Sequence, residues 1–365
     1  MANDETPEPH VGPLSKHRQQ IIEYIKKSLN YTPFETRWIP SSNRFIAAGS
    51  YPRNTGCLFI YQLARGELKQ VKEVEKPHPF KCMTFGQSPL EERKLATGDF
   101  QGNLNIWDIE NFDKPVFNVK AHGSIVNAID GALYAGPPEL VTGSRDGAVK
   151  IWDARQAEKP VAVLEPASAD LARDCWTVGF SNCYNKAERM VAAGYDNGDL
   201  KIFDMRTMKM RWQTNISNGI CNLNFDRPDI EMNKLVLTTL EGRVRVYDMR
   251  TFHPTMGYTH LEERVHPGTV WCCQHLPQNR DVFMSCANGE LALHKYNYPA
   301  SRTVTDHEGV KKGVVGKLEI LNKVSLSTQP ICSFDWNKSR MGLACMALFD
   351  QTLRVIICTK LENVN

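Results

Sequence analysis

One strand–turn–strand pattern recurs seven times along the 365 residues of the chain, and this repetition predicts an all-β ring of seven small sheets. A clear copy is VTGSRDGAVKIWDARQ, Val141–Gln156, where an apolar run, an Asp-Gly turn and an alternating strand ending in Trp-Asp follow one another. Asp-Gly accommodates the positive φ that a two-residue hairpin turn requires. A repeat of roughly 40 to 45 residues with this pattern is typical of a WD-repeat β-propeller, which has four strands in each blade.

The seven copies define the expected blades. They occupy residues 47–63, 95–109, 141–156, 191–205, 235–249, 283–296 and 343–358. The aligned third-strand position holds Tyr61, Trp107, Trp152, Phe203, Tyr247, His294 and Ile356, with intervals of 44 to 62 residues. Seven blades of this length use nearly the whole chain. We therefore expect a single domain over residues 20–365, preceded by a flexible tail over residues 1–19.

The two ends of the chain are expected to share the seventh blade. Only a few residues follow the strand TLRVIIC, too few for an outermost strand in that blade. The segment QIIEYIKKSLNYT, Gln20–Thr32, precedes the first blade and can supply this strand, which would close the ring and remove an open strand edge. Helical spacing is the competing interpretation, because it also fits Ile21, Ile22, Ile25 and Leu29.

One segment departs from the repeat. Residues 297–316, NYPASRTVTDHEGVKKGVVG, are polar and have no periodic apolar face. This insertion accounts for the longest interval between copies, and we expect it to be a loop between the third and fourth strands of the sixth blade. Long loops on rigid scaffolds often bind partners, but surface loops also tolerate insertions, and both interpretations remain open.

The third blade carries a set of polar residues suited to join its strands. In the WD-repeat pattern, a His before the first strand, a Ser or Thr on the second, an Asp in the turn and a Trp on the third connect by hydrogen bonds, because buried polar groups need partners. The set here is His122, Thr142, Asp146 and Trp152. We interpret it as structural rather than catalytic.

The other blades lack the full set. Gln101, Glu241 and Asn288 stand at the turn position of three of them, and His294 and Ile356 replace the Trp in two. We therefore expect apolar packing, rather than polar partners, to hold those blades together.

Several classes of function lack support in the sequence. There is no apolar stretch near 18 residues and no apolar leader, so neither a membrane span nor a secretory signal is predicted. The net charge of +3 is spread along the chain rather than clustered, which argues against a nucleic-acid surface. No phosphate loop, dinucleotide fingerprint, hydrolase motif or metal-ligand spacing occurs. We expect no enzyme activity, no cofactor and no metal.

Turns between the second and third strands of the blades are expected to expose side chains on one face of the ring. These candidate partner-binding residues are Asp99, Phe100, Arg145, Tyr195, Asp196 and Leu240. Aromatic residues and Arg are enriched at binding hot spots. Trp176 and Trp271 follow equivalent first-strand positions; they either line the same channel mouth or belong to the core between blades, and we favour the core.

A second candidate surface is a row of arginines. Aromatic-Asp-x-Arg occurs in three consecutive blades and places Arg155, Arg206 and Arg250 at the exit of the third strand, on one face. The pattern resembles the Trp-Asp-x-Arg signature of WD-repeat substrate receptors of cullin-RING ubiquitin ligases, and planar guanidinium groups pair well with acidic partners. An Arg–Asp bond within each hairpin corner is the competing interpretation.

Strings between the blades carry a more specific resemblance. RDCWTVGFSNCYN, Arg173–Asn185, and STQPICSFDW, Ser327–Trp336, together with the blade repeats resemble the dynein axonemal assembly factors of the WD-repeat family from about Gln20 to Leu361. The resemblance implies a cytoplasmic, non-catalytic scaffold for preassembly of axonemal dynein heavy chains of motile cilia. It also implies an AAA+ ATPase and prefoldin-like co-chaperone assembly as partners.

We expect the chain to act as a monomer within a larger complex. A substrate receptor of a cullin-RING ubiquitin ligase is the alternative function.

Overall fold

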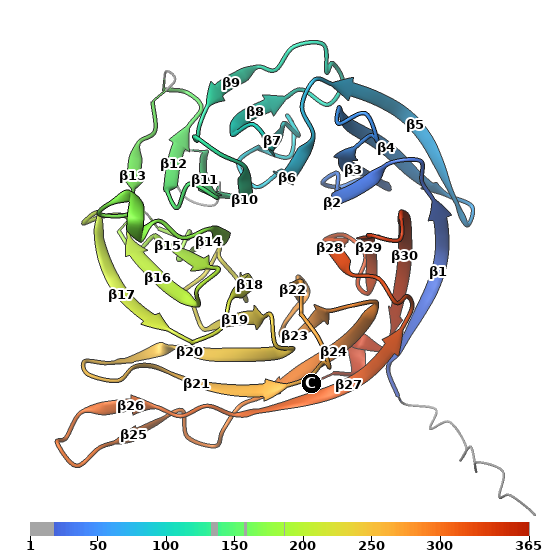
Figure 1. Cartoon of the computed structure of the whole chain (residues 1–365). Coiled ribbons are helices and arrows are strands. Elements are labelled where there is room, and N and C mark those ends of the chain that lie inside the picture. The colour runs from blue at the N-terminus through green and yellow to red at the C-terminus, as the bar shows by residue number, and fades with distance from the viewer. Residues whose placement is uncertain (1–17, 133–137, 157–158, 186, 365) are drawn as a thin grey trace, which may run out of the picture.

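A computed structural model describes residues 18–132, 138–156, 159–185 and 187–364, and it shows seven four-stranded antiparallel sheets arranged as a ring (Figure 1). This confirms the predicted all-β, seven-bladed propeller. Within the first five blades, each strand pairs with the next strand along the chain, from the innermost to the outermost. The second strand of each of these blades is buried along nearly its whole length, which explains why an apolar run recurs in the sequence and predicts the architecture.

The blades contain the following strands. Blade one is β2 (Thr32–Trp38), β3 (Arg44–Ser50), β4 (Gly56–Ala64) and β5 (Glu67–Lys76); blade two is β6 (Phe80–Thr84), β7 (Leu95–Asp99), β8 (Asn103–Trp107) and β9 (Phe117–Lys120). Blade three is β10 (Val126–Ala132), β11 (Glu139–Ser144), β12 (Val149–Asp153) and β13 (Ala162–Leu164); blade four is β14 (Cys175–Ser181), β15 (Met190–Tyr195), β16 (Asp199–Asp204) and β17 (Lys209–Asn215).

The last three blades complete the ring. Blade five is β18 (Ile220–Phe225), β19 (Lys234–Thr239), β20 (Arg243–His253) and β21 (Gly257–Arg264); blade six is β22 (Cys272–Leu276), β23 (Asn279–Cys286), β24 (Glu290–Asn297) and β27 (Lys317–Ser325). Blade seven is β28 (Ile331–Trp336), β29 (Leu343–Leu348), β30 (Thr352–Thr359) and β1 (Gln20–Ser28). Two short 3-10 helices, η1 (Ala169–Leu171) and η2 (Leu361–Asn363), lie outside the sheets.

The N-terminal strand β1 closes the ring, as predicted. It pairs antiparallel with β30, from Gln20 opposite Thr359 to Ser28 opposite Thr352. The Arg354 guanidinium, which is 2% exposed, forms an ion pair with Glu23 across this junction. Seven blades joined in this way leave no gap between first and last, because one sheet contains both ends of the chain.

Of the expected tail, residues 1–17 lie outside the described part of the chain. Gln19 is already bound to the ring: its side-chain nitrogen donates to the Lys360 carbonyl across 3.3 Å, and its carbonyl accepts a 2.9 Å bond from Asn322.

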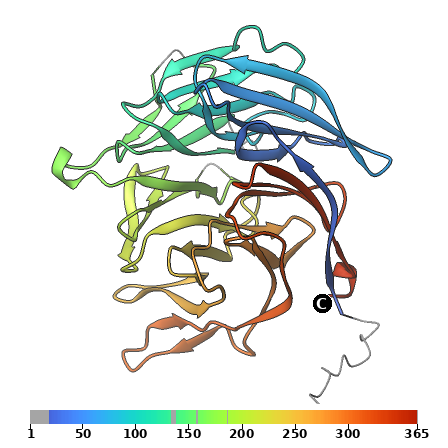
Figure 2. The same ribbon diagram turned by 45° about the vertical axis from the view of Figure 1, so that its right-hand side comes forward.

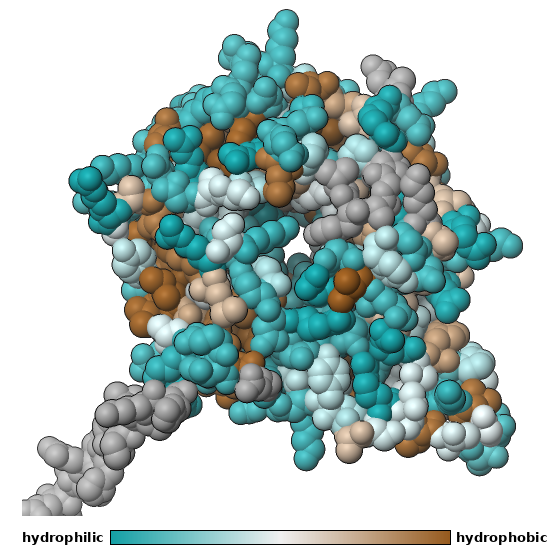
Figure 3. All heavy atoms as spheres, turned by 180° about the vertical axis from the view of Figure 1, so that it is seen from behind, coloured by the Kyte–Doolittle hydropathy of each residue, from teal (hydrophilic) through white to brown (hydrophobic). Residues whose placement is uncertain are grey.

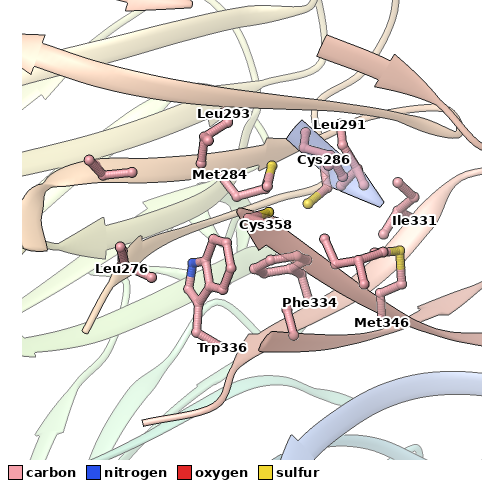
Figure 4. Packing of buried hydrophobic residues seen from close by; sticks show 14 of the residues in the cluster. Leu276, Met284, Cys286, Leu291, Leu293, Ile331, Phe334, Trp336, Met346 and Cys358 are labelled. Atoms are coloured by element: carbon pink, nitrogen blue, oxygen red, sulfur yellow. The ribbon is translucent and has the colours of Figure 1, made fainter. Parts of the chain in front are cut away.

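The hydrophobic core is divided among the interfaces between neighbouring blades. Between blades six and seven, for example, Leu276, Met284 and Leu293 of one sheet pack against Phe334 and Trp336 of the next (Figure 4). Similar clusters lie at the other junctions. Burying one face of each sheet against its neighbour stabilises the ring without a single central core, since apolar area leaves water at every junction.

Polar side chains join the innermost strands from blade to blade. At six of the junctions a side-chain oxygen accepts a backbone N–H of the next blade, and at the junction of blades two and three Cys82 Sγ donates to the Val126 carbonyl, 3.3 Å away. The six acceptor–donor pairs are Glu35–Met83 (2.6 Å), Asp130–Phe180 (2.9 Å), Thr177–Leu223 (3.1 Å), Asn222–Cys273 (3.2 Å), Gln274–Trp336 (2.8 Å) and Asp335–Trp38 (2.8 Å). Burial raises the pKa of the Glu35 and Asp130 carboxyls.

The sequence predicted that the insertion of blade six is a loop, but the structure shows that it contains two strands. β24 ends at Asn297 and β27 begins at Lys317, and the segment between them contains a hairpin of β25 (Thr303–Thr305) and β26 (Lys311–Gly313). The hairpin lies beside the long hairpin of β20 and β21 in blade five (Figure 1). Its contacts are polar and come from another blade, so they leave no apolar period in the sequence of the insertion.

Candidate interaction surfaces

The polar set of blade three forms one connected chain of hydrogen bonds. His122 Nε2 lies 2.8 Å from Thr142 Oγ1, and Trp152 Nε1 donates to the same hydroxyl across 2.9 Å. The other ring nitrogen of His122 lies 3.2 Å from both carboxylate oxygens of Asp146. His122, Thr142 and Trp152 are buried, so each polar atom in this chain requires the next one.

Electrostatics favour an ionised Asp146. Burial alone would raise the pKa of its carboxyl, but the hydrogen bond from His122 and the N–H groups of Ala148 and Gly123 outweigh burial and hold the pKa well below its usual range. These N–H groups lie 3.0 and 2.9 Å from the carboxylate. Asp146 therefore fixes both its own turn and the His122 ring.

A second chain of this kind occurs in blade six, where the sequence had suggested packing alone. His266 Nε2 and His294 Nε2 each lie 2.8 Å from Ser285 Oγ, and His266 Nδ1 lies 3.0 Å from Glu290 Oε2. His294 takes the place of the Trp, and burial lowers the pKa of its imidazole to about 3. Burial also lowers the pKa of His266. A hydroxyl between two neutral imidazoles holds the strands as Thr142 does in blade three.

The sequence contained a signal for this second chain. His266 precedes Glu290 by 24 residues, the same separation as His122 and Asp146. Sequence alignment placed Asn288 at the turn, and that register is correct, but the longer Glu290 side chain reaches back from beyond the turn to the histidine.

Two of the residues expected at exposed turns are buried. Asp99 is 3% exposed, and its carboxylate accepts the N–H groups of Gln101 and Asn103, which holds the turn itself. Tyr195 is 4% exposed and packs with Phe203 in the core between blades three and four. Both predictions of exposure were wrong, because each residue ends a strand rather than occupying the turn tip.

The remaining turn residues do reach the surface. Arg145 is exposed and lies 3.6 Å from Asp174, Leu240 is 37% exposed, and Asp196 is half-buried. Phe100 is half-buried and its ring lies 5.1 Å from that of Phe34.

Phe34 also contacts Phe349, with 6.1 Å between ring centroids, so Phe34, Phe100 and Phe349 form an aromatic cluster across blades one, two and seven. Sequence reasoning missed Phe34 and Phe349, which come from a first strand and from the irregular turn of blade seven. On the side opposite to Figure 1, the surface around the central opening is mainly hydrophilic (Figure 3).

The two tryptophans for which the sequence favoured the core are both partly exposed. Trp271 is 36% exposed, and its indole nitrogen donates to Asn288 across 2.9 Å. Trp176 is half-buried and lies against the backbone of Gly219, beside Leu240. Trp271 precedes β22 and Trp176 is the second residue of β14, so both lie near the start of an innermost strand.

Comparisons with known proteins agree along nearly the full length of the chain. A protein called dynein axonemal assembly factor 10 from Xenopus laevis is 54% identical over 97% of this chain and 99% of its own length. The proteins of that name from Homo sapiens and Chlamydomonas reinhardtii are each 52% identical, over 95% and 96% of this chain and 99% of their own lengths. The chain belongs to the dynein axonemal assembly factor 10 family. A family model described as the N-terminal domain of nucleolar protein 10-like proteins matches residues 112–278.

Membership of the dynein axonemal assembly factor 10 family confirms the resemblance seen in the strings between blades. The string Arg173–Asn185 covers β14 and the turn that follows it, and Ser327–Trp336 leads into β28. Both strings include innermost strands, whose side chains form the junctions described above. Such positions are constrained by two blades at once, which explains why they are more specific than the repeat itself.

The arginine row has a different environment in each blade. Arg155 forms two hydrogen bonds with Asp153, at 3.0 and 2.8 Å, as the corner interpretation expected. Arg250 instead lies 2.7 Å from Glu231, and Arg206 is exposed.

The feature that the three corners share involves the backbone. Asp153, Asp204 and Asp248 each accept the N–H of the arginine two residues later, at 2.8 to 3.0 Å. The repeated aromatic-Asp-x-Arg pattern therefore reflects an Asp-capped turn, and its arginine side chains need not share one role.

Two further observations concern the described part of the chain. None of its helices has the length and hydrophobicity that a membrane crossing requires. Nor do three or more His, Cys, Asp or Glu side chains gather there as a metal site would need.

Proposed function

We propose that this chain is a cytoplasmic, non-catalytic scaffold that supports preassembly of axonemal dynein heavy chains. In this role it binds an AAA+ ATPase and prefoldin-like co-chaperone assembly and acts as a single copy within a larger complex. The observation that carries the proposal is near-full-length identity of 52 to 54% to proteins named dynein axonemal assembly factor 10. The fold alone does not carry the proposal, because a propeller by itself specifies no partner.

The architecture suits a scaffold. Buried clusters and hydrogen bonds at every junction make the ring rigid, so residues on different blades keep fixed separations. A rigid display of exposed side chains lowers the ordering cost of binding. The aromatic cluster of Phe34, Phe100 and Phe349, with exposed Arg145 and Leu240, supplies the residue types that dominate protein interfaces.

Complementation tests the proposal. The chain is expressed in a Chlamydomonas reinhardtii strain that lacks its own relative, and axonemal dynein heavy chains are quantified by mass spectrometry. We expect this chain to restore the heavy chains, and a chain lacking residues 1–30 not to restore them. Radial-spoke proteins serve as the internal control. Full-length, folded chain that leaves dynein heavy chains depleted would contradict the proposal.

Partner capture tests the co-chaperone part separately. Cross-linking and affinity purification from ciliated cells should recover the ATPase, the prefoldin-like components and unassembled heavy chains. A Phe100→Glu, Phe349→Glu double variant places charge in the aromatic cluster at partly exposed positions and should reduce capture while preserving the melting temperature. Equal capture by the original chain and the double variant would assign binding to another face.

A ligase receptor is the second candidate, because Arg206 is exposed and Arg155 and Arg250 are exposed beside their carboxylate partners. The test is the triple variant Arg155→Glu, Arg206→Glu, Arg250→Glu, since charge reversal turns attraction into repulsion at each contact. With a native circular dichroism spectrum, we expect cullin adaptor capture at background for both forms. Strong capture by the original chain that is lost in the variant would favour the ligase function.

A further inference from the structure

The outer edge of blade three differs from that of the other blades. Its outermost strand, β13, pairs with β12 over three residues and has no strand on its other side. Half of the backbone N–H and C=O groups of such a strand point outward, where another chain can pair with them. An open edge is therefore available at Ala162–Leu164.

Charged side chains usually protect edge strands against pairing with another chain, and β13 contains no charged residue. Among the outermost strands of the described chain, β5, β17, β21, β27 and β1 each contain at least two charged residues and β9 contains Lys120. The sequence of β13 is Ala-Val-Leu. Charged side chains on an edge strand oppose pairing with another chain, so β13 is the outermost strand least protected against strand addition.

A groove with both apolar and charged side chains adjoins this edge, between blades three and four. It has a volume of about 250 Å³ and is lined by Val163, Leu164, Leu171 and Met210, with the buried Phe203 behind them. Val163 is 43% exposed, Leu171 61% and Met210 42%. Exposed apolar side chains gathered in one place mark an interaction site rather than ordinary surface.

The groove also has a charge bias. Arg173 and Lys201 line it, against the single carboxylate of Glu165. Lys201 Nζ lies 4.7 Å from the centre of the Tyr195 ring, which holds the ammonium at the groove wall. A ligand with acidic side chains is therefore favoured over a basic one.

We propose that the β13 edge and this groove bind an extended segment of a partner protein that alternates apolar and acidic residues. The segment adds to β13 as a fifth strand of blade three. Main-chain hydrogen bonds provide affinity, and side chains on one face enter the groove beside Val163 and Met210. Because β13 is only three residues long, the acidic residues at the ends of the segment lie beyond the paired positions and turn toward Arg173 and Lys201. This surface lies beyond the proposed dynein function and does not depend on it.

The surroundings support an extended ligand rather than a helix. Strand β17 and the segment with η1 stand beside β13 at the outer edge of the ring (Figure 1), and the η1 segment, in green, projects at the left of Figure 2. A strand placed along β13 satisfies open backbone groups that a helix, with its own bonds internal, leaves unpaired.

A designed peptide provides the probe. Fluorescein-labelled acetyl-Glu-Val-Glu-Val-Glu-Val-Glu amide is titrated with the full chain, and binding is followed by fluorescence anisotropy. A second peptide has Pro in place of the central Val, which removes one N–H donor. We expect saturable binding of the first peptide and at least tenfold weaker binding of the second. Hydrogen exchange should slow in Ala162–Leu164 and not in the edge strand β5.

Matched variants locate the site. Val163→Lys places a charge on the β13 edge, and Val71→Lys places the same charge on β5, where the exposed fraction is 45%. Arg173→Glu changes the charge of the groove without touching the edge. We expect Val163→Lys and Arg173→Glu each to weaken peptide binding at least tenfold and Val71→Lys to leave it unchanged. If Val163→Lys lowers the melting temperature, its effect on peptide binding could come from unfolding, and the binding of the Arg173→Glu variant alone then tests the proposal.

Several results would overturn the proposal. They are absence of saturable binding up to about 1 mM peptide, equal binding by the Val163→Lys and Arg173→Glu variants, or equal weakening by Val71→Lys. A concentration-dependent dimer abolished by Val163→Lys, without peptide binding, would instead assign the edge to a second copy of this chain. Sedimentation of the unliganded chain measures that outcome.

Discussion

Arg302 Nη2 and Asp248 Oδ2 lie 2.8 Å apart, and this ion pair ties the blade-six insertion to the third strand of blade five. Asp248 is 2% exposed, so its carboxylate depends on this partner and on the Arg250 N–H at 2.8 Å. Farther along, His253 Nε2 lies 2.9 Å from Asp306 Oδ2 at the hairpin tips. The insertion is therefore held at both ends against a blade to which it does not belong in sequence.

Arg302→Ala should destabilise the protein by about 1 to 3 kcal/mol, because it leaves a buried carboxylate short of a partner. Urea denaturation measures the loss, and hydrogen exchange in Thr303–Gly313 should accelerate. His307→Ala, at a side chain that is 88% exposed, is the control and should be neutral. Equal stability of the two variants would mean that the insertion is only loosely attached.

Trp152→Ala should cost about 3 to 5 kcal/mol, since it removes a large buried ring and the donor to Thr142. Trp271→Ala removes the same side chain where it is 36% exposed and should cost much less. The comparison is made by chemical denaturation. A neutral Trp152→Ala variant would contradict the role assigned to the polar set of blade three.

Asp146 should make stability depend on acid pH. Its pKa in the folded state is lowered, so its contribution is fully present above the unfolded pKa of about 3.9 and is lost as the pH falls through the folded value. Between pH 6 and pH 3, the original chain should therefore lose more free energy of unfolding than Asp146→Asn. Asp170→Asn, at an exposed carboxylate, should behave like the original chain.

Ser285→Ala tests the second polar chain. The substitution removes the hydroxyl that two buried imidazole nitrogens share, which should cost about 1 to 3 kcal/mol. Ser325→Ala, at an exposed serine of the same blade, should have little effect. Indistinguishable urea midpoints would show that packing alone holds blade six, as the sequence first suggested.

Ring closure can be tested by truncation. Removing residues 1–16 should leave the melting temperature unchanged, whereas removing residues 1–30 deletes β1 and leaves Arg354 without Glu23. The longer truncation should melt at a markedly lower temperature in differential scanning calorimetry. Glu23→Gln isolates the ion pair from the strand and should have an intermediate effect. Identical melting of both truncations would argue against closure by β1.

The repeat predicted the ring and its closure, but local spacing was ambiguous at β1. A register shift between Glu23 and Ile25 moves the apolar side chains from one face of β1 to the other, so Ile21 packs between blades six and seven, and Ile25 and Leu29 pack between blades seven and one. Topology settled the question where periodicity could not. The need for a fourth strand in blade seven was visible in the sequence, whereas the bulge was not.

The candidate surfaces were less predictable, because exposure depends on packing between segments far apart in sequence. Tyr195 directly precedes a turn in the sequence, but its side chain is covered by neighbouring strands. Phe34 and Phe349 meet only because blades one and seven are neighbours in a closed ring. The insertion hairpin is held by ion pairs with blade five, and charged residues carry no periodic signal of where they dock.

The shared seventh blade determines when the ring can close during synthesis of the protein. Glu23 and Arg354 are separated by 331 residues, so a ribosome working at about 5 to 20 residues per second delivers the partner of β1 only after tens of seconds. Until then the ring of the nascent chain is incomplete, because β30, the strand that pairs with β1, has not been synthesised. The last blade is therefore the step at which a folding helper, or a premature stop, has the greatest effect on yield.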